Sequence, residues 1–457
     1  MKALKWILIS LVAMIVLAFM FYAEEDWRGK RDWENYKRQL EASGETFDWS
    51  DYIPPTVPDA QNFFEAPKMQ EWFIRDPDSN THEFEVLFND QKFMAIVSSA
   101  SHGQPNLINS VATAEQFLDW SDSFEQEFNL IREASKRPFA RMDGSYSDPY
   151  DRPVPDYTNV KLISYALGQR ARSYLLIGQP QKALDELTLL DDIRRIYEAP
   201  PSGKPITLAT VLIDAAICTV YQDVVAYGIQ SHLWQEPQLE TVEKQLEQID
   251  LSIFMKDALR EERAALCYKI TIEVIGKIDP NRSNIARGWL CQNLVTLSKW
   301  YQQAIDGIDI SNKIVAPDAV IRVDNELKEV DSSRFQFLSH PYSFWTAVLM
   351  PNLPKAIETF AWVQTLVSEA QIACALERYR LAHGQYPETL NALVPQYMQT
   401  IPHDIIGGQP LHYRRTDDGK FQLYSIGWNE QDDGGQPSPR NENGVIDYTK
   451  GDWVWPN

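Results

Sequence analysis

Residues 375–435 read ALERYRLAHGQYPETLNALVPQYMQTIPHDIIGGQPLHYRRTDDGKFQLYSIGWNEQDDGG. This stretch decides the fold of the C-terminal part of the chain, and it begins inside a helix that we expect over 355–383. The apolar residues of that helix recur every three or four positions, which puts them on one face. Gly384 can adopt the left-handed conformation that ends helices, and Pro387 cannot continue one. A short second helix is predicted over 389–394.

A β-hairpin is expected after the second helix. Its strands are predicted over 411–415 and 421–426, because apolar and polar residues alternate in the second run. The sequence Asp-Asp-Gly at 417–419 is typical of a tight turn between strands. An acidic loop, NEQDDGG at 429–435, follows the hairpin, and its two glycines let the backbone turn sharply. Three tryptophans are expected to cover the sheet: Trp428, Trp453 and Trp455.

The order of these elements resembles the C-terminal part of the major pseudopilins of type II secretion systems. The resemblance rests on ALERYRLAHGQYP, NALVP, IPHD, LHYRR, DDG and FQLYSIGWN, followed by the acidic loop. It covers roughly 100 of the 457 residues and implies a small α+β module with a calcium-binding loop after the last strands. Pseudopilins begin with this helix and carry a prepilin peptidase site, which residues 1–22 lack. Assembly into a pilus is therefore not implied.

Calcium is the cofactor that the sequence indicates. Calcium binds six to eight oxygen atoms, and Asn429, Asp432 and Asp433 crowd side-chain oxygens into one loop. The resemblance implies ligands at Ser425 and Ile426, together with Asp432 and Asp433, and residues of the tail could close the site. The candidate ligands are Ser425, Ile426, Asn429, Asp432, Asp433 and Asp447, with Asn443 and Asp452 as further donors. The alternative is a solvated loop with Asx turns and no metal.

The N-terminus carries an uninterrupted apolar stretch, WILISLVAMIVLAFMFY at 6–22. A helix of this length rises about 25 Å, close to the minimum for crossing a membrane. Lys2 and Lys5 precede the run and favour a cytoplasmic N-terminus. A cleaved signal peptide, cut after residues 21–23, is the alternative. Both interpretations place the rest outside the cytoplasm, so we expect a single-pass protein of the bacterial inner membrane with its bulk in the periplasm.

The residues after the apolar run are expected to connect it to the folded part. Residues 24–40 contain no proline and are predicted to continue the anchor helix, with Trp27, Trp33 and Tyr36 at the level of the lipid headgroups. The sequence IPPTVP at 53–58 cannot be helical, because proline lacks the backbone donor and restricts the residue before it. We predict that it is an extended tether.

The middle of the chain is predicted to be an irregular helical bundle or a short α-solenoid. Apolar residues recur at three- and four-residue spacing in 113–135, 157–177, 180–198, 206–230, 237–249, 255–276 and 287–305. Tyr174, Gly178 and Ala183 resemble one tetratricopeptide hairpin, without a regular repeat. Gly168 and Ala171 should allow close helix approach. The four cysteines, which lack metal-ligand spacing, are expected to be buried free thiols: Cys218, Cys267, Cys291 and Cys374.

The sequence therefore predicts a mainly α protein with a small α+β module at its end. Its parts are a transmembrane anchor at 1–23, a juxtamembrane helix and Pro-rich tether at 24–58, a mixed lead-in at 59–112, a helical domain at 113–341 and a pseudopilin-like module at 342–457. FEVLF at 84–88 has the pattern of a strand, and 307–341 that of a charged connector. The layout resembles uncharacterised envelope proteins of the planctomycete and verrucomicrobial type, which implies architecture and no activity.

Composition and motifs limit the function classes. The chain has 457 residues, 44% of them hydrophobic, which is enough for a sizeable core. A net charge of −21 argues against nucleic acid and against an anionic-lipid surface as partners. We expect a non-enzymatic envelope protein that binds other proteins through its helical middle or its C-terminal end; an accessory role in secretion is implied by the resemblance alone. The alternatives are a periplasmic enzyme with an acidic site at Asp214 or Glu261, and a calcium-dependent binding module.

Overall fold

The computed structural model describes residues 2–75, 108–198, 207–275, 287–330, 339–350, 353–440 and 446–456. Within these ranges the chain is mainly helical, as predicted, with a small sheet near the C-terminus. It forms two compact units, each assembled from separate stretches of sequence. Unit 1 comprises Met1–Ile53, Leu259–Gly307 and Asp318–Pro354, and unit 2 comprises Pro54–Ala258, Ile308–Pro317 and Lys355–Asn457. The division predicted from sequence, at 113–341 and 342–457, follows the chain and does not coincide with these units.

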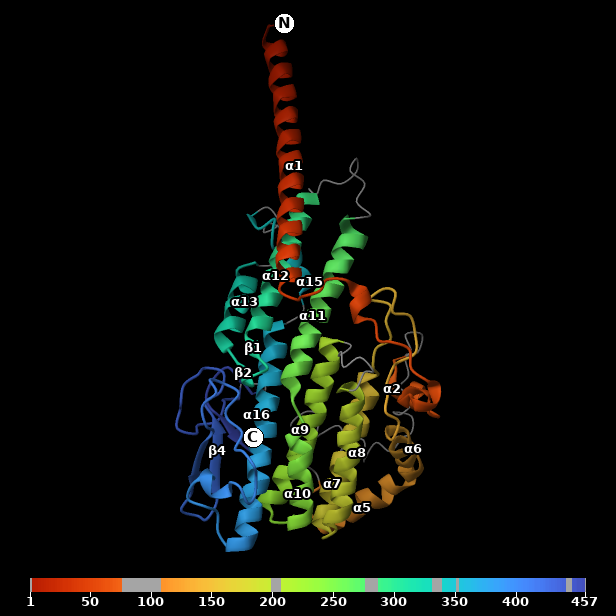
Figure 1. Cartoon of the computed structure of the whole chain (residues 1–457), viewed down its shortest axis with the longest axis vertical. Helices are drawn as coiled ribbons and strands as arrows, with labels where there is room; N and C mark the ends of the chain where they lie inside the picture. Colours follow the sequence, from red (N-terminus) through yellow and green to blue (C-terminus); the bar gives the residue numbers. More distant parts are fainter. Residues whose placement is uncertain are drawn as a thin grey trace. The chain divides into compact units, whose positions relative to one another are not determined.

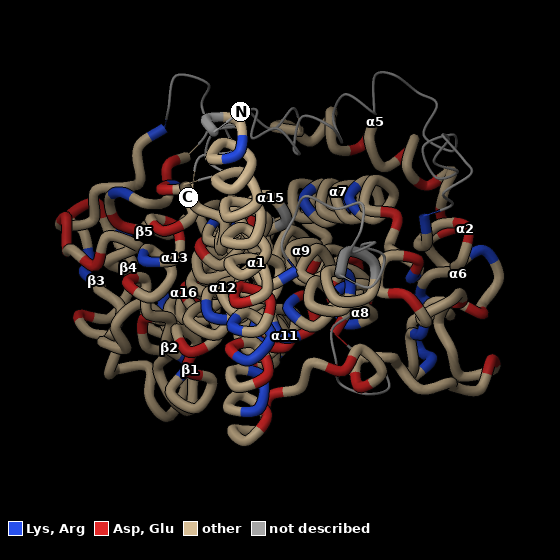
Figure 2. Tube along the Cα trace, turned by 90° about the horizontal axis from the view of Figure 1, so that it is seen from above, with Lys and Arg blue, Asp and Glu red and all other residues tan. Residues whose placement is uncertain are grey.

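Unit 1 is organised around α1 (Lys2–Ala42), one helix that starts with the apolar run and continues into the folded part of the unit (Figure 1). The side chains from Leu4 to Tyr22 are exposed, and the helix is long and apolar enough to cross a membrane. After Lys5, the next charged residue of the helix is Glu24. Figure 2 shows tan turns of α1 after its N-terminus and turns with blue and red residues farther along. The prediction that the helix continues through residues 24–40 is therefore confirmed.

A second helix also has the length and composition of a membrane span. This is α9 (Leu208–Gln230) of unit 2, but 72% of its apolar window is buried inside the unit. Burial on this scale is typical of the central helix of a folded core, and it accounts for the apolar character of α9 without a membrane.

The second half of α1 packs against α12 (Arg287–Asp306), and two glycines allow the close approach. A Cβ atom on Gly29 would overlap the backbone of Gly288, and a Cβ atom on Gly288 would overlap the backbone of α1. The Gly288 N–H donates to the Asp26 carboxylate at 2.7 Å, and Gln292 donates to Asp32 at 2.9 Å. Side-chain size and polar pairing therefore both fix the crossing.

Other helices of unit 1 pack around α12. They are the later part of α11 (Leu251–Lys269) with η5 (Ile270–Ile275), then α13 (Pro317–Glu329) and α15 (Phe344–Leu349). The Trp300 indole donates to Glu326 of α13 at 2.5 Å, and the Thr346 hydroxyl donates to the Asn293 carbonyl at 2.8 Å. The predicted connector at 307–341 thus contains a helix, α13. That helix was not predicted, because the many charged residues of this segment weaken its apolar periodicity.

The chain after α1 folds back over the helix. Phe47 packs edge-to-face on Trp33, with ring centroids 5.5 Å apart. Glu45 accepts hydrogen bonds from Arg260 and Arg263 of α11. Trp33 is consequently buried, so the prediction that it lies at the level of the lipid headgroups is wrong.

Unit 2 contains most of the helices predicted for the middle of the chain. They are α5 (Val111–Ser121), α6 (Glu125–Ser135), α7 (Tyr157–Leu176), α8 (Pro180–Glu198), α9, α10 (Glu236–Glu247) and the start of α11. The unit also contains α2 (Met69–Phe73), a short helix in the lead-in for which no helix was predicted. Gly178 ends α7 in the left-handed conformation, at φ 73°. A Cβ on Gly168 would lie 2.6 Å from a methyl group of Val220 on α9, which confirms the expected close approach. The strand pattern at 84–88 lies outside the described residues.

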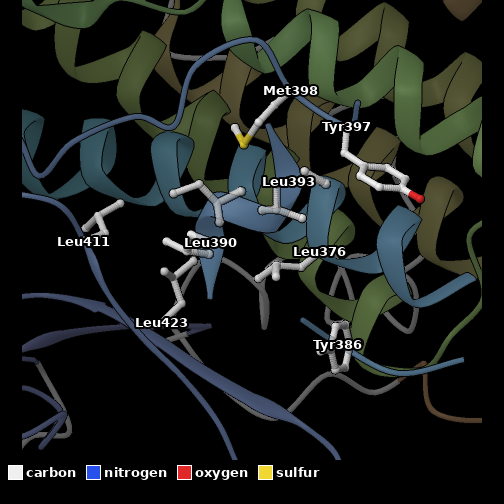
Figure 3. Packing of buried hydrophobic residues seen from close by; sticks show 10 residues of the cluster. Leu376, Tyr386, Leu390, Leu393, Tyr397, Met398, Leu411 and Leu423 are labelled. Atoms are coloured by element: carbon white, nitrogen blue, oxygen red, sulfur yellow. The ribbon is translucent and has the colours of Figure 1, made fainter. Parts of the chain in front are cut away.

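The C-terminal part of unit 2 follows the predicted order. Helix α16 (Leu353–His383) ends at Gly384, which has φ 78°, and η6 (Leu390–Leu393) is the predicted short helix. Strands β3 (His412–Arg415) and β4 (Phe421–Ser425) form the hairpin, with Tyr413 opposite Leu423. Buried residues of α16, η6 and the sheet form one hydrophobic cluster (Figure 3).

Three of the described strands were not predicted. Trp453 and Trp455 do not cover the sheet but belong to its third strand, β5 (Trp453–Trp455), which pairs antiparallel with β4. A second hairpin, β1 (Ile308–Asp309) with β2 (Ile314–Val315), lies in the predicted connector. Both strands of that hairpin are only two residues long, too short for alternation to be recognised in sequence.

Candidate functional site

A pocket of about 330 Å³ opens in unit 2 beside α16. Its walls come from three parts of the chain besides α16, namely the turn between α10 and α11, Lys313 of the β1–β2 hairpin, and the loop 400–405. We call it the α16 pocket. Its volume is within the range of small-ligand sites.

The wall between α16 and α11 is built by one glutamine. Gln364 accepts a hydrogen bond from the Leu251 backbone N–H at 2.8 Å, and its amide N–H donates to the Ile249 carbonyl at 3.3 Å. Asp250 caps the same helix start, accepting from the Ser252 N–H at 3.0 Å. Two of the unmatched backbone N–H groups at the start of α11 are therefore paired, and Gln364 ties the turn to α16.

The groups that face the α16 pocket are mixed in character. Lys313 lies 3.5 Å from Asp250 and stays largely exposed. Gln371 is half-buried, and its amide has no hydrogen-bond partner within the described residues. Val367 and Ile401 add apolar surface. The pocket therefore offers amide and charged groups beside an apolar wall.

The sequence ALERYR explains how the C-terminal part is held on the helices of unit 2. Arg378 donates to Glu236 and Glu243 of α10 and to the Tyr397 carbonyl. Glu377 is fully buried and accepts from Arg380, from the Tyr386 hydroxyl at 2.7 Å and from His232. Burial alone would raise the pKa of Glu377, but these donors outweigh it and lower the pKa below its usual value.

A buried acidic cluster lies between α16 and the end of β4. The Asp404 carboxylate accepts from the Ser425 hydroxyl at 2.8 Å and from the Ile406 and Ile426 N–H groups. Burial raises its pKa to about 6, although these hydrogen bonds act in the opposite direction. Glu369 of α16 is fully buried, and neither of its oxygens forms a hydrogen bond within the described residues. Burial and the nearby Asp404 carboxyl raise the pKa of Glu369 well above its usual value.

The acidic loop is closed by its own backbone and by Asp452. The Asp452 carboxylate, which is fully buried, accepts from the Asp433 N–H at 3.2 Å and the Gly435 N–H at 2.6 Å. Asp432 accepts from the Tyr424 hydroxyl at 3.1 Å and from the Gly434 N–H at 2.9 Å. These hydrogen bonds hold the loop against Asp452 and Tyr424.

The predicted calcium ligands fall into separate groups. Ser425 and Ile426 contact Asp404, whereas Asn429 donates to Asp433 at 3.0 Å. Asp447 accepts from Thr449 at 2.5 Å, and Asn443 lies outside the described residues. Across the described ranges, no three His, Cys, Asp or Glu side chains are grouped to hold a metal ion. The six residues stay a predicted ligand set, and Asp452 is the tail residue that contacts the loop in the structure.

The acidic residues considered for catalysis lie in packed polar networks. Asp214 is buried on α9, 3.6 Å from Arg194 of α8 and 3.8 Å from the Cys218 sulfur. Burial raises the pKa of Asp214 to about 7. Glu261 is buried in unit 1, and Arg263 pairs with Glu45. Neither carboxyl lines the α16 pocket.

All four cysteines are buried free thiols, as predicted.

The residues that build the α16 pocket and the buried acidic cluster beside β4 were not identified from the sequence. Glu369 has a recognisable signal, since it is a charged residue within the apolar run LVSEAQIA of a helix. Gln364 and Lys313 have no such signal, because their roles depend on contacts with residues more than 60 positions away along the chain.

No family model, curated protein or solved structure matches the chain, so its function has to be inferred from its own residues.

Proposed function

We propose that the protein is a membrane-anchored, non-enzymatic component of the bacterial cell envelope that binds another protein through the α16 pocket. Helix α1 would span the inner membrane once, with the rest of the chain in the periplasm. The observation that carries the binding proposal is the pocket itself, in which the half-buried Gln371 lies with the apolar side chains of Val367 and Ile401.

This chemistry suits an extended segment of a partner protein. A glutamine amide can donate to and accept from a peptide group at once, while apolar side chains of the segment can bury against the neighbouring wall. Lys313 and Asp250 at the rim can pair with charged side chains of the partner. The pseudopilin resemblance of residues 355–457 supports a partner within a secretion or pilus-like machine.

Photo-crosslinking in cells tests the proposal. A benzophenone amino acid replaces Thr400, an exposed residue of the pocket loop, and in a matched variant replaces Thr449, an exposed threonine of the same unit outside the pocket. We expect a discrete adduct from position 400 that is weakened by Gln371→Ala and absent from position 449. Equal adducts from both positions, or none from position 400, would contradict binding at the pocket.

Calcium-dependent binding by the acidic loop stays a prediction. Asp432 and Asp452 accept hydrogen bonds from the N–H groups of Gly434 and Gly435, so the carboxylates that would bind calcium already lie together with the loop backbone. Isothermal titration of the full chain with calcium distinguishes a calcium-binding loop from a metal-free loop. If the loop binds calcium, wild type releases heat and an Asp432→Asn/Asp433→Asn variant does not.

A further inference from the structure

One end of unit 1 lies at the level where the apolar run of α1 ends. Tyr22 is the last residue of that run, and its ring centroid is 6.3 Å from that of Trp289. Trp289 belongs to the first turn of α12, and the preceding Gly288 donates to Asp26 of α1 at 2.7 Å. The start of α12 is therefore fixed beside residues 22–26.

Two further segments of unit 1 reach the same level. The Tyr342 hydroxyl, just before α15, donates to Glu25 at 3.0 Å and accepts from Arg28. Helix α11 runs antiparallel to α12, because Arg263 contacts Gln302 and Cys267 contacts Ser298. Continuing this register puts Ile272 opposite residue 293, about 6 Å along α12 from Trp289.

Exposed apolar residues from three segments gather at this end. The exposed fractions are 62% for Trp27, 51% for Ile272, 50% for Val348 and 36% for Tyr342. Trp27 is five residues beyond Tyr22, a rise of about 7.5 Å along α1, which is close to the depth of the headgroup layer. Its ring also stacks beneath the Arg31 guanidinium, 4.6 Å away, a pairing suited to an apolar–aqueous boundary.

We propose that this end of unit 1 is a lipid-contacting surface, which we call the membrane collar and define by Trp27, Ile272, Tyr342 and Val348. Its occupant is the headgroup layer of the bilayer that α1 crosses, because the collar is continuous with the apolar run through the Tyr22–Trp289 contact. Aromatic side chains are favoured at that depth. Unit 1 is thus seated on the membrane and does not stand away from it on a flexible stalk. The inference rests on the proposed anchoring by α1.

Fluorescence quenching in vesicles tests the collar. The full chain is reconstituted in phosphatidylcholine vesicles that contain a lipid with a nitroxide on its headgroup. Single added cysteines, Val348→Cys and Ile272→Cys, carry a bimane label, and wild type treated alike gives the background of its four buried thiols. We expect loss of fluorescence at both positions when the nitroxide lipid is present.

Ile321→Cys is the matched control. Ile321 is 37% exposed and lies on α13, whose Ala319 contacts Gln303 near the far end of α12. That position is about 21 Å along α12 from Trp289, so its label should show no loss above background. Quenching at 348 and 272 no greater than at 321 would overturn the proposal. Protection of these labels from aqueous iodide without quenching by the lipid would also overturn it, because protein would then cover the collar. A chain that does not insert into vesicles refutes the anchoring itself.

Discussion

At the scale of single residues, the buried carboxyl of Glu369 gives the sharpest prediction. Its pKa is raised in the folded protein from an ordinary value of 4.5, so the native state holds a proton that the unfolded chain releases. Its contribution to stability is complete below about pH 4.5 and declines as pH rises toward the raised pKa. Glu369→Gln cannot lose a proton. We therefore expect the free energy of unfolding of this variant, relative to wild type, to be higher at pH 8 than at pH 5 in urea titrations.

Glu377 on the same helix is the matched control, because its pKa is shifted the other way. Burial would raise that pKa, but hydrogen bonds from Arg380, Tyr386 and His232 lower it, so the charged form stabilises the fold. Its contribution is present above the ordinary value of 4.5 and is lost as pH falls. Glu377→Gln should therefore be destabilised relative to wild type, more at pH 8 than at pH 4. Responses of the same sign in both variants would refute the assignment of a neutral Glu369.

Asp452 should be a structural residue of the acidic loop. Its carboxylate accepts two backbone N–H groups, from Asp433 and Gly435, in a buried position. Asp452→Ala would leave both donors unsatisfied, at a cost of about 1–3 kcal/mol, and Asp452→Asn should cost less because one acceptor remains. Thermal melts of the full chain measure the difference. An unchanged melting temperature in Asp452→Ala would mean that the loop is not held by this side chain.

At the scale of elements, a buried arginine joins α5, α6, α7 and α8. Arg170 of α7 donates to Asp122, Glu125 and Glu186, and the side chains of Arg170 and Glu186 are 1% and 4% exposed. Arg170→Ala leaves Glu186 buried without its main partner, so we expect a loss of about 3–5 kcal/mol in urea unfolding.

The double variant Arg170→Met/Glu186→Leu provides the control. It removes both charges and keeps the volume, so it should recover most of the stability that Arg170→Ala loses. A double variant as unstable as Arg170→Ala would show that the loss does not come from leaving Glu186 buried without a partner.

The helices were predictable because their apolar periodicity is local. The segments at 157–177 and 180–198 correspond to α7 and α8 almost residue for residue, and Gly384 ends α16 as expected. Strand β5 was not predicted, since its three residues become a strand only by pairing with β4, some 30 positions earlier. The α16 pocket was also beyond prediction. In the sequence, Gln364 is one polar residue among others of a helix. Only the fold shows that its side chain accepts from the first N–H group of α11 and so forms a wall of the pocket.

At the scale of the whole molecule, α1 unites the apolar run with the folded part of unit 1. The helix continues from Lys2 to Ala42 without a break, and the glycine crossing at Gly29 and Gly288 joins its second half to α12. Because α1 is one continuous helix that also belongs to the core of unit 1, its apolar run is joined rigidly to the folded part of the unit. The pocket proposal and the collar proposal both depend on this anchoring.

Alkaline extraction of membranes from cells that produce the full chain tests this anchoring most directly, with the intact mass read from the pelleted protein. We predict that wild type stays in the membrane pellet with residues 6–22 still present. Leu11→Arg/Met14→Arg should shift the chain toward the soluble fraction, because each arginine at the centre of a span costs about 2.5–3.5 kcal/mol on insertion scales. Wild type in the soluble fraction, or a mass that lacks the apolar run, would contradict the account.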